Sequence, residues 1–152
     1  MAVLIEGTQR IEAPIDRVWA AINDPEVLRR CIPGCLELEK LSDHEMRGKI
    51  QLGIGPIKAT FQGAVALENM VPPHSCTITG EGKGGIAGFA KGSADVRLSE
   101  EGEAATLLAY SVRTEVGGKI AQLGARLIVS TSKKLAGEFF TALGRTLDAE
   151  AA

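Results

Sequence analysis

Residues 119–148, KIAQLGARLIVSTSKKLAGEFFTALGRTLD, decide the fold because they are the longest stretch of the chain with helical periodicity. No proline interrupts them, and their apolar residues recur at the spacing of one helix face. This pattern predicts an amphipathic C-terminal helix of roughly 25–30 residues, which is well above the usual length. The apolar stripe comprises Ile120, Leu123, Leu127, Ile128, Leu135, Phe139, Ala142, Leu143 and Leu147.

The part of the chain before this helix has a different period. Residues 57–67, IKATFQGAVAL, alternate between apolar residues and Lys58, Thr60 and Gln62, and similar segments follow one another between Gly- and Pro-rich turns. Such alternation predicts an antiparallel sheet with one covered face. At the N-terminus, residues 3–11 predict a first strand, and residues 15–24 and 24–34 predict two short helices.

A long amphipathic helix and a half-covered antiparallel sheet bury their apolar faces best against each other, which predicts an α+β fold. The 152 residues, 16.0 kDa, suit a single domain over residues 1–152. The net charge of −2 does not suggest a nucleic-acid binder. The N-terminus resembles no secretory signal, no segment is apolar enough to span a membrane, and the cysteine count is odd, so we expect a reduced, cytoplasmic protein.

Several motifs resemble a known family. The pieces are I-x-A-P-x-x-x-V-W in residues 11–19, N-D-P-E-V-L in 23–28, C-I-P-G-C in 31–35, G-x-G-P-I-K-A-x-F-x-G in 53–63, and the Gly-rich GEGKGGIAGFAKGSADVRL in 80–98. The first is typical of the START-like (SRPBCC) superfamily, and the C-I-P-G-C and G-P-I-K-A stretches resemble the CoxG-like family of carbon monoxide dehydrogenase subunits. The resemblance covers nearly the whole chain. It implies a helix-grip fold, in which a curved antiparallel sheet of about six or seven strands wraps around the C-terminal helix.

The resemblance also implies a function. Such a protein would be a non-catalytic accessory to an aerobic molybdenum hydroxylase of the carbon monoxide dehydrogenase type. It would bind a lipophilic molecule such as a quinone or lipid in an internal cavity, recruit the enzyme to the membrane, or both. The chain stops soon after the predicted helix, so any membrane contact is expected to be peripheral, at the inner face. We expect no cofactor and no nucleic-acid partner.

The composition itself is consistent with a hollow interior, because aromatic residues make up only 4% of the chain. In residues 86–98 the predicted inward positions are Ile86, Gly88, Ala90, Gly92, Ala94, Val96 and Leu98, four of them consecutive glycines or alanines. Small residues facing a helix leave space for a ligand, or they let the sheet curve and the helix approach closely. The family resemblance favours the cavity. Its predicted wall comprises Ile50, Leu52, Phe61, Val65, Ile78, Gly88, Ala90, Gly92, Ala94, Leu108, Tyr110, Val112, Leu123, Leu127 and Thr131.

Tyr110 is the only tyrosine, and the alternation of the last strand places it on the inward face. A buried phenol requires a hydrogen-bond partner. Its hydroxyl could donate to a ligand carbonyl, as in a quinone. The alternative, a bond to a neighbouring backbone group, is the more common outcome for buried side chains.

The CIPGC stretch raises the possibility of a redox or metal site. One C-x3-C pair with a distant Cys76 does not form a zinc set, and the βαβ unit of thioredoxin-like sites is missing, so buried structural cysteines are favoured and no metal is expected. Pro33-Gly34 predicts a tight turn at the end of the second helix. In helix-grip proteins this turn lies at the cavity mouth, so we assign Ile32 and Pro33 to the mouth, together with Phe89 on the exposed side of the Gly-rich hairpin.

Two enzymatic interpretations remain weak. Residues 80–85, GEGKGG, match G-x-G-x-x-G, but a strand and not a helix follows, so nucleotide binding is rejected. His44 and His74 follow turn signals, and no nucleophile has a base beside it in the sequence pattern. We therefore expect no enzyme. A cyclase- or hydrolase-like cavity enzyme and an adaptor with a filled core are the alternatives.

Overall fold

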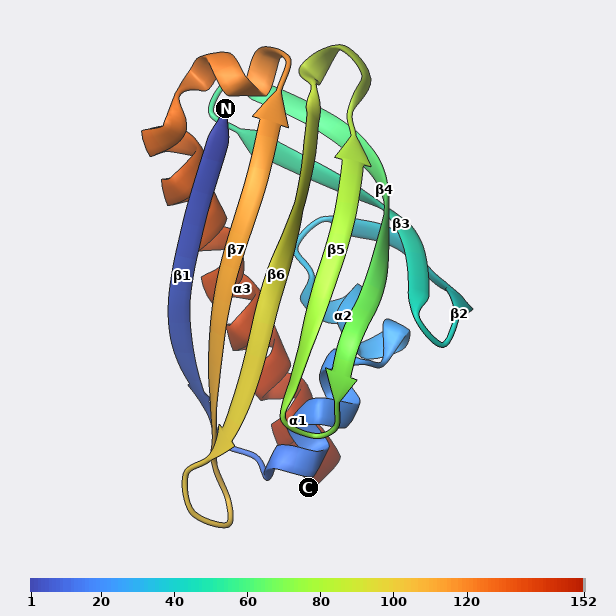
Figure 1. The fold of residues 1–152 in the computed structure, drawn as a ribbon, viewed down its shortest axis with the longest axis vertical. Helices are drawn as coiled ribbons and strands as arrows, with labels where there is room; N and C mark the ends of the chain where they lie inside the picture. The colour runs from blue at the N-terminus through green and yellow to red at the C-terminus, as the bar shows by residue number, and fades with distance from the viewer. Residues whose placement is uncertain (152) are drawn as a thin grey trace.

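The computed structural model describes residues 1–151 and contains one seven-stranded antiparallel sheet in the order β1-β7-β6-β5-β4-β3-β2. The long helix α3 lies against one face of this sheet, and α1 and α2 lie at one end of it (Figure 1). This is the predicted α+β helix-grip arrangement. The elements are β1 (Ala2–Ile11), α1 (Ile15–Ile22), α2 (Pro25–Cys31), β2 (Cys35–Ser42), β3 (Glu45–Ile54), β4 (Ile57–Val71), β5 (Ser75–Lys83), η1 (Gly85–Ala87), β6 (Phe89–Glu100), β7 (Thr106–Gly117), η2 (Lys119–Leu123) and α3 (Ala125–Ala151).

Two predicted boundaries were wrong. The long helix begins at Ala125 and not at Lys119, because Gly124 has a φ of +90° that ends the short 3₁₀ turn η2 before α3 starts. The strand predicted from residue 86 begins at Phe89. Residues 85–87 form the 3₁₀ turn η1, and Ile86, expected on the inward face, is 84% exposed.

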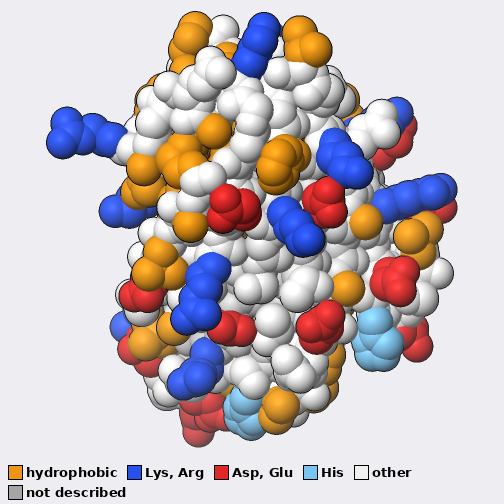
Figure 2. Space-filling view, turned by 45° about the horizontal axis from the view of Figure 1, so that its top comes forward, with side chains coloured by type: hydrophobic (Ala, Val, Ile, Leu, Met, Phe, Trp, Pro, Cys, Tyr) orange, Lys and Arg blue, Asp and Glu red, His pale blue; other side chains and the backbone are white. Residues whose placement is uncertain are grey.

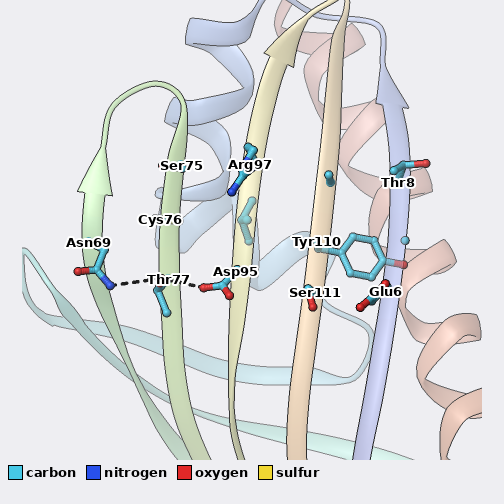
Figure 3. Close-up of a pocket in the computed structure, with 13 residues that line it drawn as sticks. Glu6, Thr8, Asn69, Ser75, Cys76, Thr77, Asp95, Arg97, Tyr110 and Ser111 are labelled. Carbon is cyan, nitrogen blue, oxygen red and sulfur yellow. Dashed lines mark hydrogen bonds between the residues drawn. The ribbon is translucent and has the colours of Figure 1, made fainter.

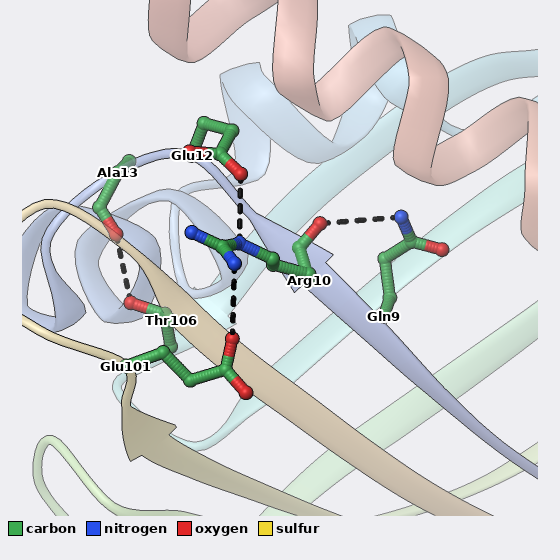
Figure 4. Close-up of polar contacts among 6 residues, drawn as sticks. All are labelled: Gln9, Arg10, Glu12, Ala13, Glu101 and Thr106. Carbon is green, nitrogen blue, oxygen red and sulfur yellow. Dashed lines mark hydrogen bonds and ion pairs between the residues drawn. The ribbon is translucent and has the colours of Figure 1, made fainter.

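The chain enters α1 through a turn that polar contacts hold in place. The buried Thr106 hydroxyl donates to the Ala13 carbonyl oxygen at 2.8 Å, which joins the start of β7 to the β1–α1 turn. Arg10 lies 2.8 Å from Glu12 and 3.7 Å from Glu101, so the β6–β7 hairpin is tied to the same turn (Figure 4). The exposed ion pairs contribute little, and the buried hydrogen bond is the stronger constraint.

The core consists of two separate clusters of buried side chains at opposite ends of α3. One end packs α1, α2 and the last turns of α3 against the sheet through Ile11, Val18, Val27, Leu98, Leu108, Leu143 and Leu147. The other packs η1, η2 and the start of α3 through Val3, Ile5, Ala87, Val116, Ile120 and Ile128. Tyr110 is packed against both clusters and lies between them. The helix is therefore gripped at its two ends.

We expect Leu143→Ala to lower the free energy of unfolding by about 2–5 kcal/mol, because Leu143 is fully buried and its loss leaves a void in the first cluster. Urea denaturation followed by circular dichroism measures this change. Leu41→Ala is the control, since Leu41 is 46% exposed on β2 and its truncation is expected to change stability by less than about 0.5 kcal/mol. Equal effects of the two substitutions would contradict the assignment of the core.

Candidate functional site

A cavity of about 540 Å³ lies between the sheet and α3, in the span between the two core clusters. Five neighbouring strands, β3 to β7, supply most of its wall, and α1, α2, β2 and α3 complete it. The side chains that reach it are almost all apolar. They include Leu28 and Ile32 from α2 and the turn after it, Leu38 from β2, Met46 and Ile50 from β3, and Phe139 and Phe140 from α3.

Most of the predicted wall residues do lie in this wall. The period-two alternation explains this agreement, because successive inward positions on paired strands meet in one surface. Ile78, Ala94 and Val112, for example, are direct cross-strand partners on β5, β6 and β7. The predicted residues found in the wall are Ile50, Phe61, Val65, Ile78, Ala90, Gly92, Ala94, Leu108, Tyr110 and Val112, together with Ile32 from the predicted mouth.

The remaining predicted residues lie outside the wall. Leu123 and Leu127 contact Gly55 in the β3–β4 hairpin and do not reach the cavity. Because α3 starts later than expected, Leu123 falls in η2 and Leu127 falls in the first turn of α3. Gly88 approaches Gly117, and the Phe89 ring covers Gly117 from the outer face of the sheet. Those outside are Leu52, Gly88, Leu123, Leu127, Thr131, Pro33 and Phe89.

Two aromatic residues of the cavity wall, Phe139 and Phe140, were not predicted to belong to it, although Phe61 and Tyr110 were. Phe139 and Phe140 meet edge to face with ring centroids 5.2 Å apart, and Phe140 stacks on Tyr110 at 5.9 Å with an interplanar angle of 28°. Phe139 belongs to the predicted apolar stripe, but only the placement of α3 brings both rings into the wall. The doublet FF in residues 139–140 was the available sequence signal.

The small residues of the wall serve both purposes that the sequence left open. A Cβ on Gly92 would collide with the Arg113 carbonyl oxygen, so this glycine permits close approach of β6 and β7. A Cβ on Gly82 would meet no atom within 4 Å, so this glycine leaves space. Gly92 thus serves the close approach of strands, whereas Gly82 serves the open space of the cavity.

The Tyr110 ring lies across Gly7 of the neighbouring strand β1, where any side chain would collide with it. No side-chain hydrogen bond within residues 1–151 involves its hydroxyl, which lies over Gly7 and is not fully buried, so the expected bond to a backbone group is not formed. Tyr110 thus presents a phenol without a protein partner, on a ring held by Phe140.

The CIPGC stretch forms the predicted tight turn. Gly34 has a φ of +72°, and its carbonyl oxygen accepts a hydrogen bond from the Gln51 backbone N–H at 2.8 Å. Cys31 is buried, with its Sγ 3.6 Å from the Thr146 hydroxyl, and no disulfide joins it to Cys35. Within residues 1–151 no three His, Cys, Asp or Glu side chains are grouped as metal ligands would be.

Cys35 differs from the other two cysteines because it is partly exposed and lines the cavity. Its thiol donates to the Glu37 carbonyl oxygen at 3.4 Å. Burial raises the pKa of the Cys35 thiol, and the Arg29 guanidinium and the backbone contact oppose this only in part. Burial also raises the pKa of the Cys76 thiol. Neither group has the lowered pKa of a reactive cysteine.

A second depression, of about 700 Å³, lies on the opposite, outer face of the sheet (Figure 3). Its side chains are mostly polar and stand on five adjacent strands, β1, β7, β6, β5 and β4. The Thr77 hydroxyl donates a hydrogen bond to Asp95 at 2.9 Å and accepts one from the Asn69 amide at 3.5 Å. Glu6, Asp95 and Arg97 are exposed to solvent there. This depression is larger, but we consider the apolar cavity the candidate site, because concave sites with mostly apolar walls are what hold small molecules in proteins.

The comparisons with known proteins agree on family and fold. The family model for CoxG, which is described as a subunit of carbon monoxide dehydrogenase, matches residues 7–148. A conserved protein from Geobacillus kaustophilus superposes with a TM-score of 0.91 at 26% identity, covering 97% of this chain and 96% of that one. The ZhuI aromatase/cyclase from Streptomyces sp. R1128 (TM-score 0.74, 11% identity, 100% and 97% covered) and a START superfamily protein from Mycobacterium smegmatis (TM-score 0.73, 14% identity, 96% and 97% covered) share the fold.

A comparison with curated proteins finds no match. Within residues 1–151, none of the helices combines the length and the apolar character that crossing a bilayer would require.

We expect Cys35 to be the only thiol that iodoacetamide labels in the folded protein, because Cys31 and Cys76 are buried. The raised pKa leaves less thiolate at any pH below it, so labelling should be slow at neutral pH and accelerate only above the ordinary thiol value of about 8.5. Mass spectrometry of tryptic peptides across a pH series measures this. A molecule that fills the cavity should protect Cys35, and equal labelling of all three cysteines would contradict the packing described.

Proposed function

Because the chain belongs to the CoxG family of carbon monoxide dehydrogenase subunits, we propose that it is an accessory protein of an aerobic molybdenum hydroxylase that carries a lipophilic molecule in its cavity. The ligand class we propose is a quinone or lipid, with the protein acting as a shuttle or bringing the enzyme to the membrane. The observation that supports this proposal most directly is the apolar cavity of about 540 Å³.

The size and chemistry of the cavity favour such a ligand. Cavities of roughly 300–1,000 Å³ are typical of sites for small organic molecules. A charged or strongly polar molecule would lose its hydration here without gaining partners, since the inward side chains are almost all apolar. A ring with one or two carbonyl groups and an aliphatic chain fits this environment, with the ring against Phe140 and Tyr110.

A binding role is also favoured over catalysis by what the wall lacks. Glu37, Arg47, Glu81 and Lys91 contribute to the wall, but their side chains are exposed to solvent. Neither His44 nor His74 belongs to it, since both lie at hairpin turns. Acid–base catalysis requires a positioned pair of proton donors and acceptors. The inward groups available for it are the Tyr110 phenol, the Thr114 hydroxyl and the weakly acidic Cys35 thiol.

We further propose that the Tyr110 hydroxyl donates a hydrogen bond to a carbonyl oxygen of the ligand. Two features of the residue support this role: Tyr110 belongs to the cavity wall, and its ring is held by Phe140, with the hydroxyl over Gly7 at the β1 side of that wall. Ile32, on the turn after α2, would then belong to the entrance from the α2–β2 side.

Filling the cavity tests the carrier proposal. Ala94→Phe places a ring among Ile78 and Val112 and should weaken binding of a lipophilic ligand by at least about ten-fold without lowering stability. Ala64→Phe is the matched control, because Ala64 is exposed on the outer face of β4. Native mass spectrometry before and after organic extraction, followed by titration with a quinone, measures occupancy and affinity. Unchanged binding by Ala94→Phe would place the ligand elsewhere.

Removing the phenol tests the hydrogen bond. Tyr110→Phe keeps the ring and its stacking, so we expect a loss in quinone affinity of about two- to ten-fold, the usual effect of one neutral hydrogen bond. An alkane of similar length, which has no carbonyl, should bind both proteins equally. Isothermal titration gives both affinities. If the substitution lowers binding of the quinone and the alkane alike, the hydroxyl has no role in recognising the ligand.

A further inference from the structure

The most exposed large apolar side chain of the described residues is Ile86, which is 84% exposed at the tip of the β5–β6 connection. The loop that carries it is well ordered by hydrogen bonds. The Gly84 N–H donates to the Gly88 carbonyl oxygen at 2.8 Å, and the Gly88 N–H donates to that of Gly85 at 3.1 Å. Ala87 is buried in the second core cluster beneath the tip. The ordered loop therefore keeps the Ile86 side chain exposed to solvent, which is unfavourable for an apolar group.

Other apolar and basic side chains surround this tip. Phe89, 40% exposed, lies on the outer face beside its cross-strand neighbour Lys83, and Lys91 follows on the same face. Lys119 of η2 is close by, because Gly118 contacts Gly88. Figure 2 shows hydrophobic side chains and Lys or Arg together over this end of the molecule. We call Ile86, Phe89, Lys83, Lys91 and Lys119 the η1 surface.

The charges of the molecule are distributed unevenly along its long axis. Two carboxylates flank Lys91 on the neighbouring strands. Glu81 lies 3.6 Å from Lys83 and offsets its charge, and Glu115 lies 2.8 Å from the N-terminal amine. Residues 116–137 contain four basic residues and no acidic one. The opposite end holds the β6–β7 hairpin, with the exposed Glu100, Glu101 and Glu103. The η1 surface is therefore the basic end.

We propose that the η1 surface docks on an anionic lipid bilayer. Ile86 and Phe89 would enter the interfacial region while the lysines lie among acidic head groups. A bilayer fits better than a protein partner because the apolar part is a protruding tip. A tip buries little area against a rigid surface, whereas stable protein interfaces need about 800 Å² on each side. A fluid bilayer can surround a protruding side chain and bury it on all sides. Basic residues beside exposed apolar ones are typical of contacts with anionic membranes.

The docking end is next to the candidate cavity, and this part of the inference rests on the proposed function. Gly84, at the base of the loop, is in contact with the Phe61 ring, and any side chain on Gly84 would collide with it. Phe61 is also part of the cavity wall. One aromatic ring thus separates the docked loop from the ligand site, which places the proposed membrane source of a lipophilic ligand close to where it would be held.

Vesicle sedimentation tests the surface. The full chain should bind vesicles of phosphatidylcholine mixed with phosphatidylglycerol and not vesicles of phosphatidylcholine alone, and high salt should release it. Ile86→Asp should weaken binding at least about ten-fold. Lys91→Ala and Lys119→Ala should each weaken it about five-fold. Leu41→Asp is the matched control, since Leu41 is an exposed leucine on β2 and its change should leave binding as it was.

Fluorescence gives the orientation. Trp19, the only tryptophan, is in α1 at the opposite end, so brominated lipids should not quench the unsubstituted protein. Ile86→Trp should add emission that those lipids do quench. Quenching of Trp19, equal binding to neutral vesicles, or undiminished vesicle binding by Ile86→Asp would each overturn the proposal. If Ile86→Asp instead abolishes co-purification with a molybdenum hydroxylase while vesicle binding persists, the η1 surface is a protein interface and the proposal is wrong.

The outcome is separable from that of the carrier proposal. Quinone binding in vesicle-free solution depends on the cavity, so Ile86→Asp should retain it while Ala94→Phe loses it. For vesicle binding we expect the opposite pattern. Ala94→Phe should retain it, because Ala94 faces the interior, and Ile86→Asp should weaken it. A protein that binds vesicles but no quinone would refute the cavity role and leave the docking surface standing.

Discussion

The packing of α3 at its two ends is the constraint on which the rest of the structure depends. Leu143 and Leu147 fasten its C-terminal turns to the sheet, and Ile128 fastens its beginning. Between these points the helix passes over strands whose inward residues include Ala90, Gly92 and Ala94. The helix cannot move toward them without losing contacts at both ends, so the middle remains open. Close packing is thus achieved where it stabilises the fold and is absent where a ligand would lie.

The same arrangement separates the roles of the two ends of the molecule. One end is closed by α1 and α2 and by the buried hydrogen bond from Thr106 to Ala13. The other end exposes an isoleucine on a loop that glycines and backbone hydrogen bonds hold rigid. Exposed apolar surface is costly, and its position beside Lys91 and Lys119 suits the anionic bilayer that we propose as its partner. The carrier role that we propose would use both the apolar cavity and a contact with the phase that supplies the ligand.

Prediction from the sequence succeeded where the evidence was local. Alternation in residues 57–67 identified the inward face of β4, including Phe61 and Val65, and the same reasoning held for Ala90 to Ala94. It failed at Ile86, because the Gly-rich connection leaves the strand pattern before β6 begins. Prediction from the sequence also placed the helix start at Lys119, because Ile120 continues the apolar stripe. The positive φ of Gly124 interrupts the helical backbone, and this is not visible in the pattern of apolar residues.

The sequence alone determined the order of elements, the covered face of the sheet and the family, because periodicity and short motifs depend on neighbouring residues. Only the tertiary structure decided which part of α3 faces the cavity, that Phe139 and Phe140 line it, and that the Tyr110 ring lies between Phe140 and Gly7. These facts depend on distances between segments that are far apart in the chain. Such distances are set by the packing of the whole core, and no local pattern records them.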